Sequence, residues 1–381
     1  MRLYEHEASA LFATEGIPVP ESKAVASAVE ARRVAEELGP PVVVKAQVLA
    51  GGRGLAGGVR MAGSPAEAGE AAAQLLGSTI RGMPVDRVMV ARRVEVAREL
   101  YLGVTVDGYK GLPRVILSAE GGVSIEGLAR THPERVASRP VSMVQGLRLF
   151  EARQMAREAG LVGGQTVQVA AILHALYRVF RRYDALLAEI NPLACTPEGQ
   201  YMAIDAKLEI DDSSLYRHTE LGIDPEGRID NPLERMGRQI GVTYVDLDGE
   251  VGTISSGAGL GMASMDIVGR RFRPANFLET GGAITEELLY QAMGLVLHKG
   301  GLKGVFINLY GGINPIHEGA RGVVRYIQEH GVTIPVVAKA LGNRQEETWE
   351  ILRRGGVHVV TDVETEKGVE ELFRLMEEGT R

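Results

Sequence analysis

The sequence has 381 residues, of which 45% are hydrophobic and 24% charged, and its 42 basic and 49 acidic side chains give a net charge of −7. This length predicts two or three globular domains. The acidic balance argues against a non-specific binder of nucleic acids or anionic membranes, because no overall positive field attracts phosphate polymers. The single cysteine, Cys195, excludes an internal disulfide framework. Acidic side chains near the start and the lack of a long apolar run predict a cytoplasmic protein with neither a signal peptide nor a membrane span.

The first half of the chain is predicted to mix helices, strands and glycine-rich loops. Amphipathic periodicity, apolar runs and turn residues mark these elements. The predicted elements are helices over 1–16, 26–39, 64–77 and about 150–182, strands over 40–48 and 86–92, a hairpin over 98–122, and two strands over 185–210 joined by a Pro-Glu-Gly turn.

The second half repeats one unit from about residue 243, in which a strand is followed by a glycine turn and a helix. Strands that alternate with helices of this length indicate βαβ units and a parallel sheet. The polar, turn-rich stretch over 225–242 separates the two patterns. We therefore expect an α/β protein with domains at 1–236 and 237–381.

A lysine inside an apolar strand is the first sign of chemistry. Lys45 lies in the run VVVKAQ, and a buried ammonium is costly unless an anion meets it. The glycines of the following AGGRGLAGG loop allow the backbone to close over a ligand and offer amides to phosphates. The alternative is a snorkelling lysine on an edge strand beside a flexible loop.

Three oxygen-bearing side chains mark a second candidate site. Glu189 and Asn191 of AEINPL are two residues apart and point to one face of a strand, and Asp205 of MAIDAK can reach that face from the neighbouring strand. A few such ligands combined with nucleotide phosphates are a usual way to hold Mg²⁺. The alternative is a solvated hairpin with ordinary polar faces.

Three glycine turns follow strands in the second half, in SSGAGLGM, TGGAIT and YGGINPIHEG. Backbone amides at the start of a helix attract anions, and open α/β sheets bind ligands at the carboxyl ends of their strands. His317 follows the third turn, where it could meet a phosphoryl group, but we expect a surface histidine in the first turn of a helix.

Several long segments resemble the succinyl-CoA synthetase β-subunit family, in family order along nearly the whole chain. They include VVVKAQVLAGGRGLAGGV, RELYLG, AEGGVSIE, AEINPL, GAGLGMASMDIV, PANFLETGG and GVFINLYGGIN. The resemblance implies an N-terminal ATP-grasp fold followed by a flavodoxin-like (Rossmann-like) parallel-sheet CoA-ligase domain. It also implies an α-subunit partner that binds CoA and carries a phosphohistidine, in an αβ heterodimer or heterotetramer.

The resemblance also implies roles for individual residues. The phosphates of the nucleotide (ATP/ADP, or GTP/GDP) would be bound by Lys45 and by the loop residues Gly52, Arg53 and Gly54, with Glu99 at the same site. Asn191 and Asp205 would hold Mg²⁺, and Glu189 would steady the partner's histidine. The acid substrate or the phosphohistidine region would be bound by Gly312, Ile313 and Asn314, with Ser256. A phosphoryl group would pass between a carboxylate, the histidine and the nucleotide.

The sequence departs from the family pattern at a few positions. Ser256 stands where the family commonly has Asn, and Ala91 stands where a Glu usually meets the purine. The expected substrate is a small dicarboxylic acid, most simply succinate, and malate–CoA and citrate–CoA ligases are alternatives. A non-catalytic nucleotide-binding paralogue and a single-chain ATP-grasp carboxylate–amine ligase are further alternatives.

Overall fold

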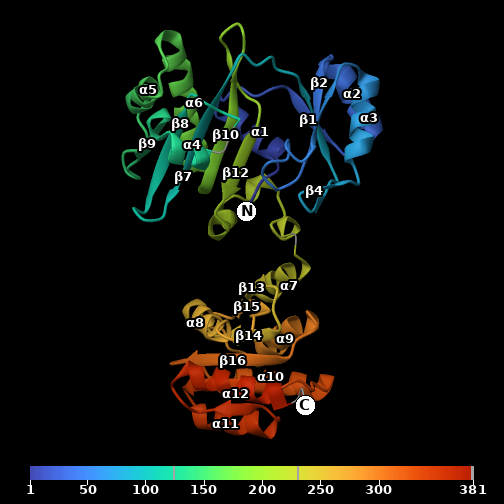
Figure 1. Ribbon diagram of the computed structural model, residues 1–381, viewed down its shortest axis with the longest axis vertical. Coiled ribbons are helices and arrows are strands. Elements are labelled where there is room, and N and C mark those ends of the chain that lie inside the picture. The colour runs from blue at the N-terminus through green and yellow to red at the C-terminus, as the bar shows by residue number, and fades with distance from the viewer. Residues whose placement is uncertain (123–124, 230, 379–381) are drawn as a thin grey trace. The chain divides into compact units, whose positions relative to one another are not determined.

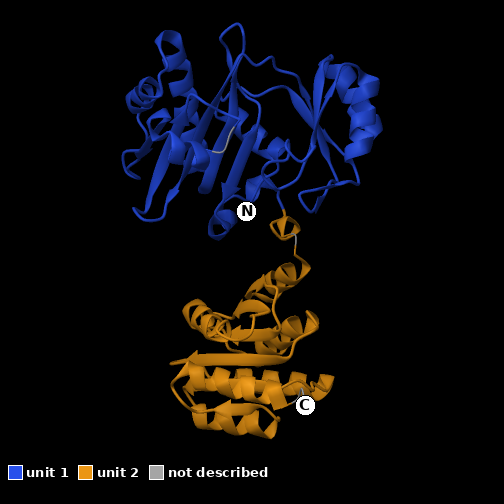
Figure 2. Ribbon diagram, viewed as in Figure 1, with its two compact units in different colours: residues 1–223 blue, residues 224–381 orange. Residues whose placement is uncertain are grey.

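The computed structural model describes residues 1–122, 125–229 and 231–378. It divides into two compact units, Met1–Ile223 and Asp224–Arg381 (Figure 2). The boundary expected between residues 236 and 237 falls within the helix α7 (Pro232–Ile240) of the second unit and stays a proposal. Within the described ranges, no helix combines the length and apolarity that a bilayer span requires.

The first unit contains a small antiparallel sheet, whose strands β1 and β2 are labelled in Figure 1; the strand order is β1-β6-β2-β3. The strands are β1 (Ser22–Val25), β6 (Val88–Arg92), β2 (Val42–Ala46) and β3 (Val59–Ala62), the helices packed on them are α2 (Ala28–Leu38) and α3 (Pro65–Leu75), and β4 (Thr79–Ile80) pairs with β5 (Met83–Pro84). Serine caps fix where both helices begin, because Ser27 and Ser64 accept from the amides of Glu30 and Glu67. Sheet and helices enclose one apolar core.

A larger antiparallel sheet, in the order β11-β10-β7-β8-β9 with β12 also beside β10, completes the first unit. Its strands are β7 (Arg98–Asp107), β8 (Leu112–Ser118), β9 (Val136–Pro140), β10 (Ala185–Cys195), β11 (Tyr201–Ala203) and β12 (Ala206–Ile210). The helical elements of this part are α1 (Glu5–Thr14), α4 (Ile125–Thr131), α5 (Leu149–Glu158) and α6 (Gly163–Arg182), with short 3-10 turns η1 (Pro133–Arg135), η2 (Asp212–Arg217) and η3 (Thr219–Leu221). This part has a second, separate core.

Two predicted elements of the first unit are subdivided. The helix expected over 150–182 is two helices, because the chain turns between them at Gly160, where φ is +83°. The second of the two strands expected over 185–210 is broken at Ile204 and Asp205, so β11 and β12 pair with opposite ends of β10.

The second unit is a doubly wound sheet in the order β13-β15-β14-β16-β17-β18. The strands are β13 (Thr243–Asp246), β14 (Val251–Ser255), β15 (Asn276–Glu279), β16 (Gly304–Gly311), β17 (Val336–Gly342) and β18 (His358–Val360), and the remaining helical elements are η4 (Glu226–Arg228), α8 (Ala258–Val268), α9 (Glu286–His298), α10 (Ile316–His330), α11 (Gln345–Arg354) and α12 (Thr365–Glu378). The edge strand β13 is antiparallel, and the other five are parallel.

Numbered along the chain, the five parallel strands have the spatial order 2-1-3-4-5, which is the flavodoxin-like order. The helices α8 and α12 pack together on one side, where they enclose a small core, and α9 and α10 form a larger core with the sheet. The order reverses between β14 and β16, so a crevice is expected beyond the carboxyl ends of these two strands.

Candidate active site

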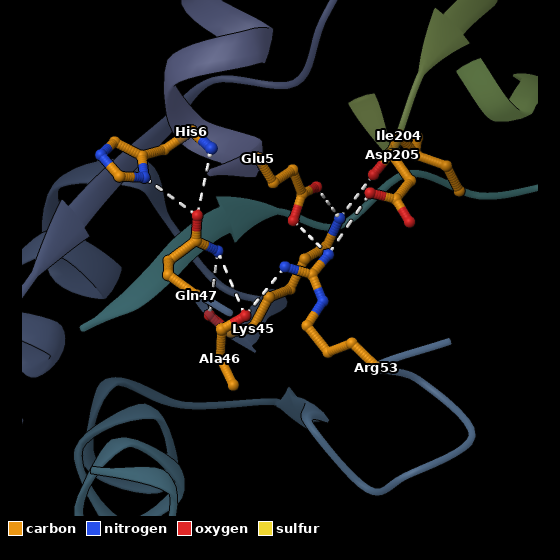
Figure 3. A network of polar contacts seen from close by, with 8 residues as sticks. All are labelled: Glu5, His6, Lys45, Ala46, Gln47, Arg53, Ile204 and Asp205. Carbon is orange, nitrogen blue, oxygen red and sulfur yellow. Dashed lines mark hydrogen bonds and ion pairs between the residues drawn. The ribbon is translucent and has the colours of Figure 1, made fainter. Parts of the chain in front are cut away.

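Lys45 lies on an interior strand and meets an anion of the protein itself. β2 runs between β6 and β3, and the Lys45 side chain is 12% exposed. Its Nζ donates to Glu5 Oε1 at 2.8 Å and also to the carbonyl oxygen of Ile204 (Figure 3). The edge-strand alternative is therefore wrong, and the anion that meets this ammonium in the structure is a carboxylate of the chain itself; its contact with phosphates stays a prediction.

Arg53 brings a second cation to the same carboxylate. Its Nη2 donates to Glu5 and lies 3.4 Å from Asp205 Oδ1, and its Nη1 donates to the carbonyl oxygen of Ala46 at 2.8 Å (Figure 3). Burial would raise the pKa of Glu5, but the charges of Lys45 and Arg53 outweigh it, so that the pKa is lowered. Glu5 is thus ionised and shared between two cations.

The glycine loop lines a cavity of about 520 Å³ beside these cations. Gly52 has φ of +71°, a left-handed conformation that favours glycine. The amides of Gly51, Gly52 and Gly54 donate no hydrogen bond to any described residue. Free amides beside a guanidinium form a cradle suited to phosphate oxygens.

The three expected oxygen ligands line the same cavity as the loop. The Asn191 side-chain oxygen accepts from the amide of Gly122 at 2.8 Å, and Glu189 Oε2 lies 3.9 Å from Lys207 Nζ. Burial raises the pKa of Glu189. Loss of solvation followed by the charge of Glu5 raises the pKa of Asp205 to about 6, although the Asp205 side chain remains 48% exposed. The fold therefore disfavours these two negative charges, as it would where a cation completes the site.

Mg²⁺ fits this donor set. In the described part of the chain, no group of three His, Cys, Asp or Glu side chains could hold a metal ion unaided. Mg²⁺ commonly binds one or two carboxylates and takes its other ligands from phosphates and water. Asp205 with the amide oxygen of Asn191 would supply the protein share of such a site.

A second, more apolar cavity of about 290 Å³ adjoins the first, and both are lined by Arg53, Gly54 and Asp205. Its wall includes Lys45, Glu99, and the apolar side chains of Val43, Val59, Met61, Ala91 and Pro192. Apolar walls that lead to a polar end suit a nucleotide base whose phosphates reach the cations. Ala91 contributes no polar side chain to this wall.

In the second unit, the predicted glycine turns are bonded to one another at the carboxyl ends of β14, β15 and β16. Ser256 Oγ accepts from the amide of Tyr310 at 2.8 Å and donates to its carbonyl oxygen at 3.1 Å. Asn314 Nδ2 donates to the carbonyl oxygen of Gly282. The amides of Gly312 and Ile313 make no bond with any described residue and remain available to an anion.

Comparison with known proteins agrees with both units. Residues 2–195 match the ATP-grasp domain family, and residues 254–371 match the CoA-ligase family. The β subunit of the GDP-forming succinate–CoA ligase of Thermus thermophilus is 43% identical over 97% of this chain and 98% of the relative. The chain belongs to the succinate–CoA ligase β-subunit family.

Further relatives support the same assignment. A β subunit of the ADP-forming succinate–CoA ligase of Archaeoglobus fulgidus is 40% identical over 99% of this chain and 100% of the relative. The ATP citrate lyase of Methanothrix soehngenii, solved with citrate and coenzyme A, has a TM-score of 0.75 over 98% of this chain and 99% of that one. At 18% identity, the latter shows the fold alone. The family resemblance and the predicted ATP-grasp and CoA-ligase folds are confirmed.

His317 departs from its predicted environment. It lies in the first turn of α10, as expected, but it is 4% exposed and is therefore not a surface residue. Its Nε2 lies 2.9 Å from Nη1 of Arg344, a residue in the turn between β17 and α11. This contact joins residues that are 27 positions apart, which the local sequence around His317 does not reveal.

The sequence patterns missed three residues of the cavity region: Glu5, Gly122 and Lys207. In the sequence, Glu5 was indistinguishable from other acidic residues at the start of a helix. In the fold it lies opposite Lys45 and pairs with its ammonium. Gly122 lies in AEGGVSIE, so its motif was identified but its contact with Asn191 was not. Lys207 follows Asp205 closely and lines the same cavity.

Proposed function

We propose that this chain is the nucleotide-binding β subunit of an ADP- or GDP-forming acyl-CoA synthetase, with succinate as the preferred acid. The observation that carries the proposal is the cavity in which Arg53, free glycine amides, Asn191 and Asp205 converge. The family membership supports the reaction type, an acid–thiol ligation coupled to a nucleoside triphosphate.

The residues of the first unit would act by positioning and by neutralising charge. Lys45, Arg53 and the loop amides would bind phosphate oxygens, and Asn191 with Asp205 would hold Mg²⁺, which supplies positive charge to the transferring phosphoryl group. Glu99 would contact the nucleotide from the apolar cavity. Glu189 would orient the histidine of an α subunit as it exchanges the phosphoryl group.

In the second unit, the free amides of Gly312 and Ile313 lie at the point where the strand order reverses, which is the usual ligand position in such sheets. With Ser256 and Asn314 they would bind the acid substrate or the phosphohistidine region. The α subunit would supply CoA binding and the histidine, in an αβ heterodimer or heterotetramer in the cytoplasm.

Incubation with γ-labelled ATP tests this division of labour. The isolated chain should bind Mg-nucleotide without forming phosphohistidine or acyl-CoA, and addition of the α subunit should place the label on that subunit. The chains are separated under alkaline conditions that preserve phosphohistidine. Label on the large chain, or acyl-CoA made by this chain alone, would refute the proposal and favour a single-chain ligase.

A substrate screen of the co-expressed pair tests the choice of acid and nucleotide. Succinate, malate and citrate are each supplied with CoA and either ATP or GTP. Greater turnover with malate or citrate would reassign the substrate. If no acid supports turnover although Mg-nucleotide binds, the chain is a non-catalytic paralogue.

A further inference from the structure

One carboxylate, that of Glu5, connects the two halves of the first unit across the candidate nucleotide site. Glu5 begins α1, whose buried residues Ala8 and Phe12 belong to the core of the large sheet. Lys45 and Arg53 come from β2 of the small sheet and from the loop after it. Each oxygen of the carboxylate receives one of these cations (Figure 3).

We propose that Glu5 is a positioning residue that holds Lys45 and Arg53 in the arrangement in which they meet the nucleotide phosphates. The inference rests on the proposed function and names a residue to which no role was assigned from the sequence. Lysine and arginine side chains are flexible, so two cations from one half reach a fixed arrangement only if something anchors them. Glu5 is suited to this task because its side chain is 5% exposed.

The anchored cations retain donors for a ligand. An ammonium has three N–H donors, and Lys45 uses two of them, on Glu5 and Ile204. A guanidinium has five, and the contacts of Arg53 with described residues involve its Nη1 and Nη2 atoms but not its Nε. Glu5 therefore fixes both groups without exhausting them.

Charge balance explains why the anchor is a single carboxylate. The two cations and Glu5 carry a net charge of +1, so the cluster still attracts phosphates while neither cation is left unpaired in a buried place. Asp205 lies close enough to Arg53 to cancel the remaining charge, but Mg²⁺ would engage this carboxylate when nucleotide binds. As a metal ligand, Asp205 would no longer offset the charge that Lys45 and Arg53 offer to the phosphates.

Glu5→Gln in the co-expressed αβ pair tests the proposal, because it retains the shape and removes the charge that orders the cations. We expect kcat to fall about 100-fold through misplacement of the cations. The affinity for Mg-ADP should not weaken by more than a few fold, because the lost anchor is offset by removal of a negative charge beside the phosphates. Calorimetry gives the affinity, and acyl-CoA formation gives kcat.

Glu15→Gln is the matched control. Glu15 closes the same helix α1 and binds two arginines, Arg178 at 2.9 Å and Arg182 at 2.7 Å, but it does not line either cavity. This variant should lose stability and leave kcat per folded molecule unchanged. Glu5→Asp, which keeps the charge but is too short to bridge both cations, should have an intermediate kcat and serves where Glu5→Gln does not fold.

The outcomes separate this inference from the proposed function. If the wild-type pair makes acyl-CoA and the Glu5 variants keep wild-type kcat, only the positioning role is refuted. A fall in affinity as large as the fall in kcat would refute it as well, since Glu5 would then serve ground-state binding. If the wild-type pair makes no acyl-CoA with any acid, the proposed function itself fails.

Discussion

The proposed phosphate contact of Lys45 leads to a prediction for Lys45→Met. Methionine fills the same place in β2 as the lysine stem, and the backbone pairs of residue 45 with Val59 and Met89 are unaffected. The substitution removes the ammonium, with its 2.8 Å bond to Glu5 and its bond to the carbonyl oxygen of Ile204. Arg53 still binds Glu5, so the carboxylate is not left without a cation. The fold should therefore survive.

The magnitude follows from the type of contact that is lost. A hydrogen bond to a charged group contributes about 1.5–3 kcal/mol. Since 1.36 kcal/mol corresponds to a factor of ten, the loss of one such contact with a phosphate should weaken nucleotide binding or slow phosphoryl transfer about 10- to 150-fold. The lost internal bonds should lower the free energy of unfolding by about 1–3 kcal/mol.

Calorimetry with Mg-ADP and turnover of the αβ pair measure this effect, on protein whose folded fraction is checked by chemical unfolding. Lys23→Met is the matched control, because Lys23 lies in the same sheet and pairs with Glu37 at 2.6 Å, but it is exposed and lines neither cavity. Its affinity and turnover should equal those of the wild type. Wild-type affinity and turnover in Lys45→Met would refute the assignment of Lys45 to the phosphates.

Three further predictions concern the metal and the pH dependence of stability. Asp205→Asn should raise the Mg²⁺ concentration for half-maximal activity about tenfold or more, and an unchanged Mg²⁺ titration would remove Asp205 from the metal site. Arg182 and Arg178 lower the pKa of Glu15, so Glu15→Gln should reduce the free energy of unfolding by about 1 kcal/mol above pH 4.5. Urea titrations should show that the difference between wild type and variant disappears as the pH falls through the lowered pKa of Glu15. Burial lowers the pKa of Lys339 from its ordinary 10.5, so Lys339→Met should increase the free energy of unfolding by about 1 kcal/mol at neutral pH. This increase should shrink as the pH rises through the lowered pKa of Lys339. A variant that is less stable than the wild type at neutral pH would contradict the prediction.

The parallel sheet of the second unit was predictable from sequence because its signals are local. Each strand is a short apolar run, each turn contains glycine, and each helix follows within a few residues. The order of strands and helices can therefore be predicted without knowledge of tertiary contacts. The antiparallel direction of β13 was not predictable in this way, since it depends on pairing with β15 more than 30 residues later.

The candidate site shows the same limit at the level of side chains. Lys45 could be identified from the sequence because it is a charged residue within an apolar run. Its partner Glu5 could not, because it is 40 residues away in a helix with other acidic residues. His317 was wrongly expected at the surface, because its burial and its contact with Arg344, 27 residues further on, depend on the tertiary fold. Both cases depend on contacts between distant elements, which no local pattern encodes.

The identity of the acid depends on which donors remain at the turns of the second unit. Ser256 could not donate to a substrate carboxylate without giving up its bond to Tyr310, because its one hydroxyl hydrogen is directed to that carbonyl oxygen. The Asn314 Nδ2 group has two hydrogens and donates one of them to the carbonyl oxygen of Gly282, and each of these side chains therefore ties one turn to the next. A carboxylate at this edge would therefore be bound by the backbone amides of Gly312 and Ile313 and by the second N–H of Asn314, with Ser256 holding the turn in place, and the backbone amides respond to the charge rather than to the shape of the acid. Discrimination between succinate and a larger or hydroxylated acid would then have to come from groups around these turns, including those of the α subunit.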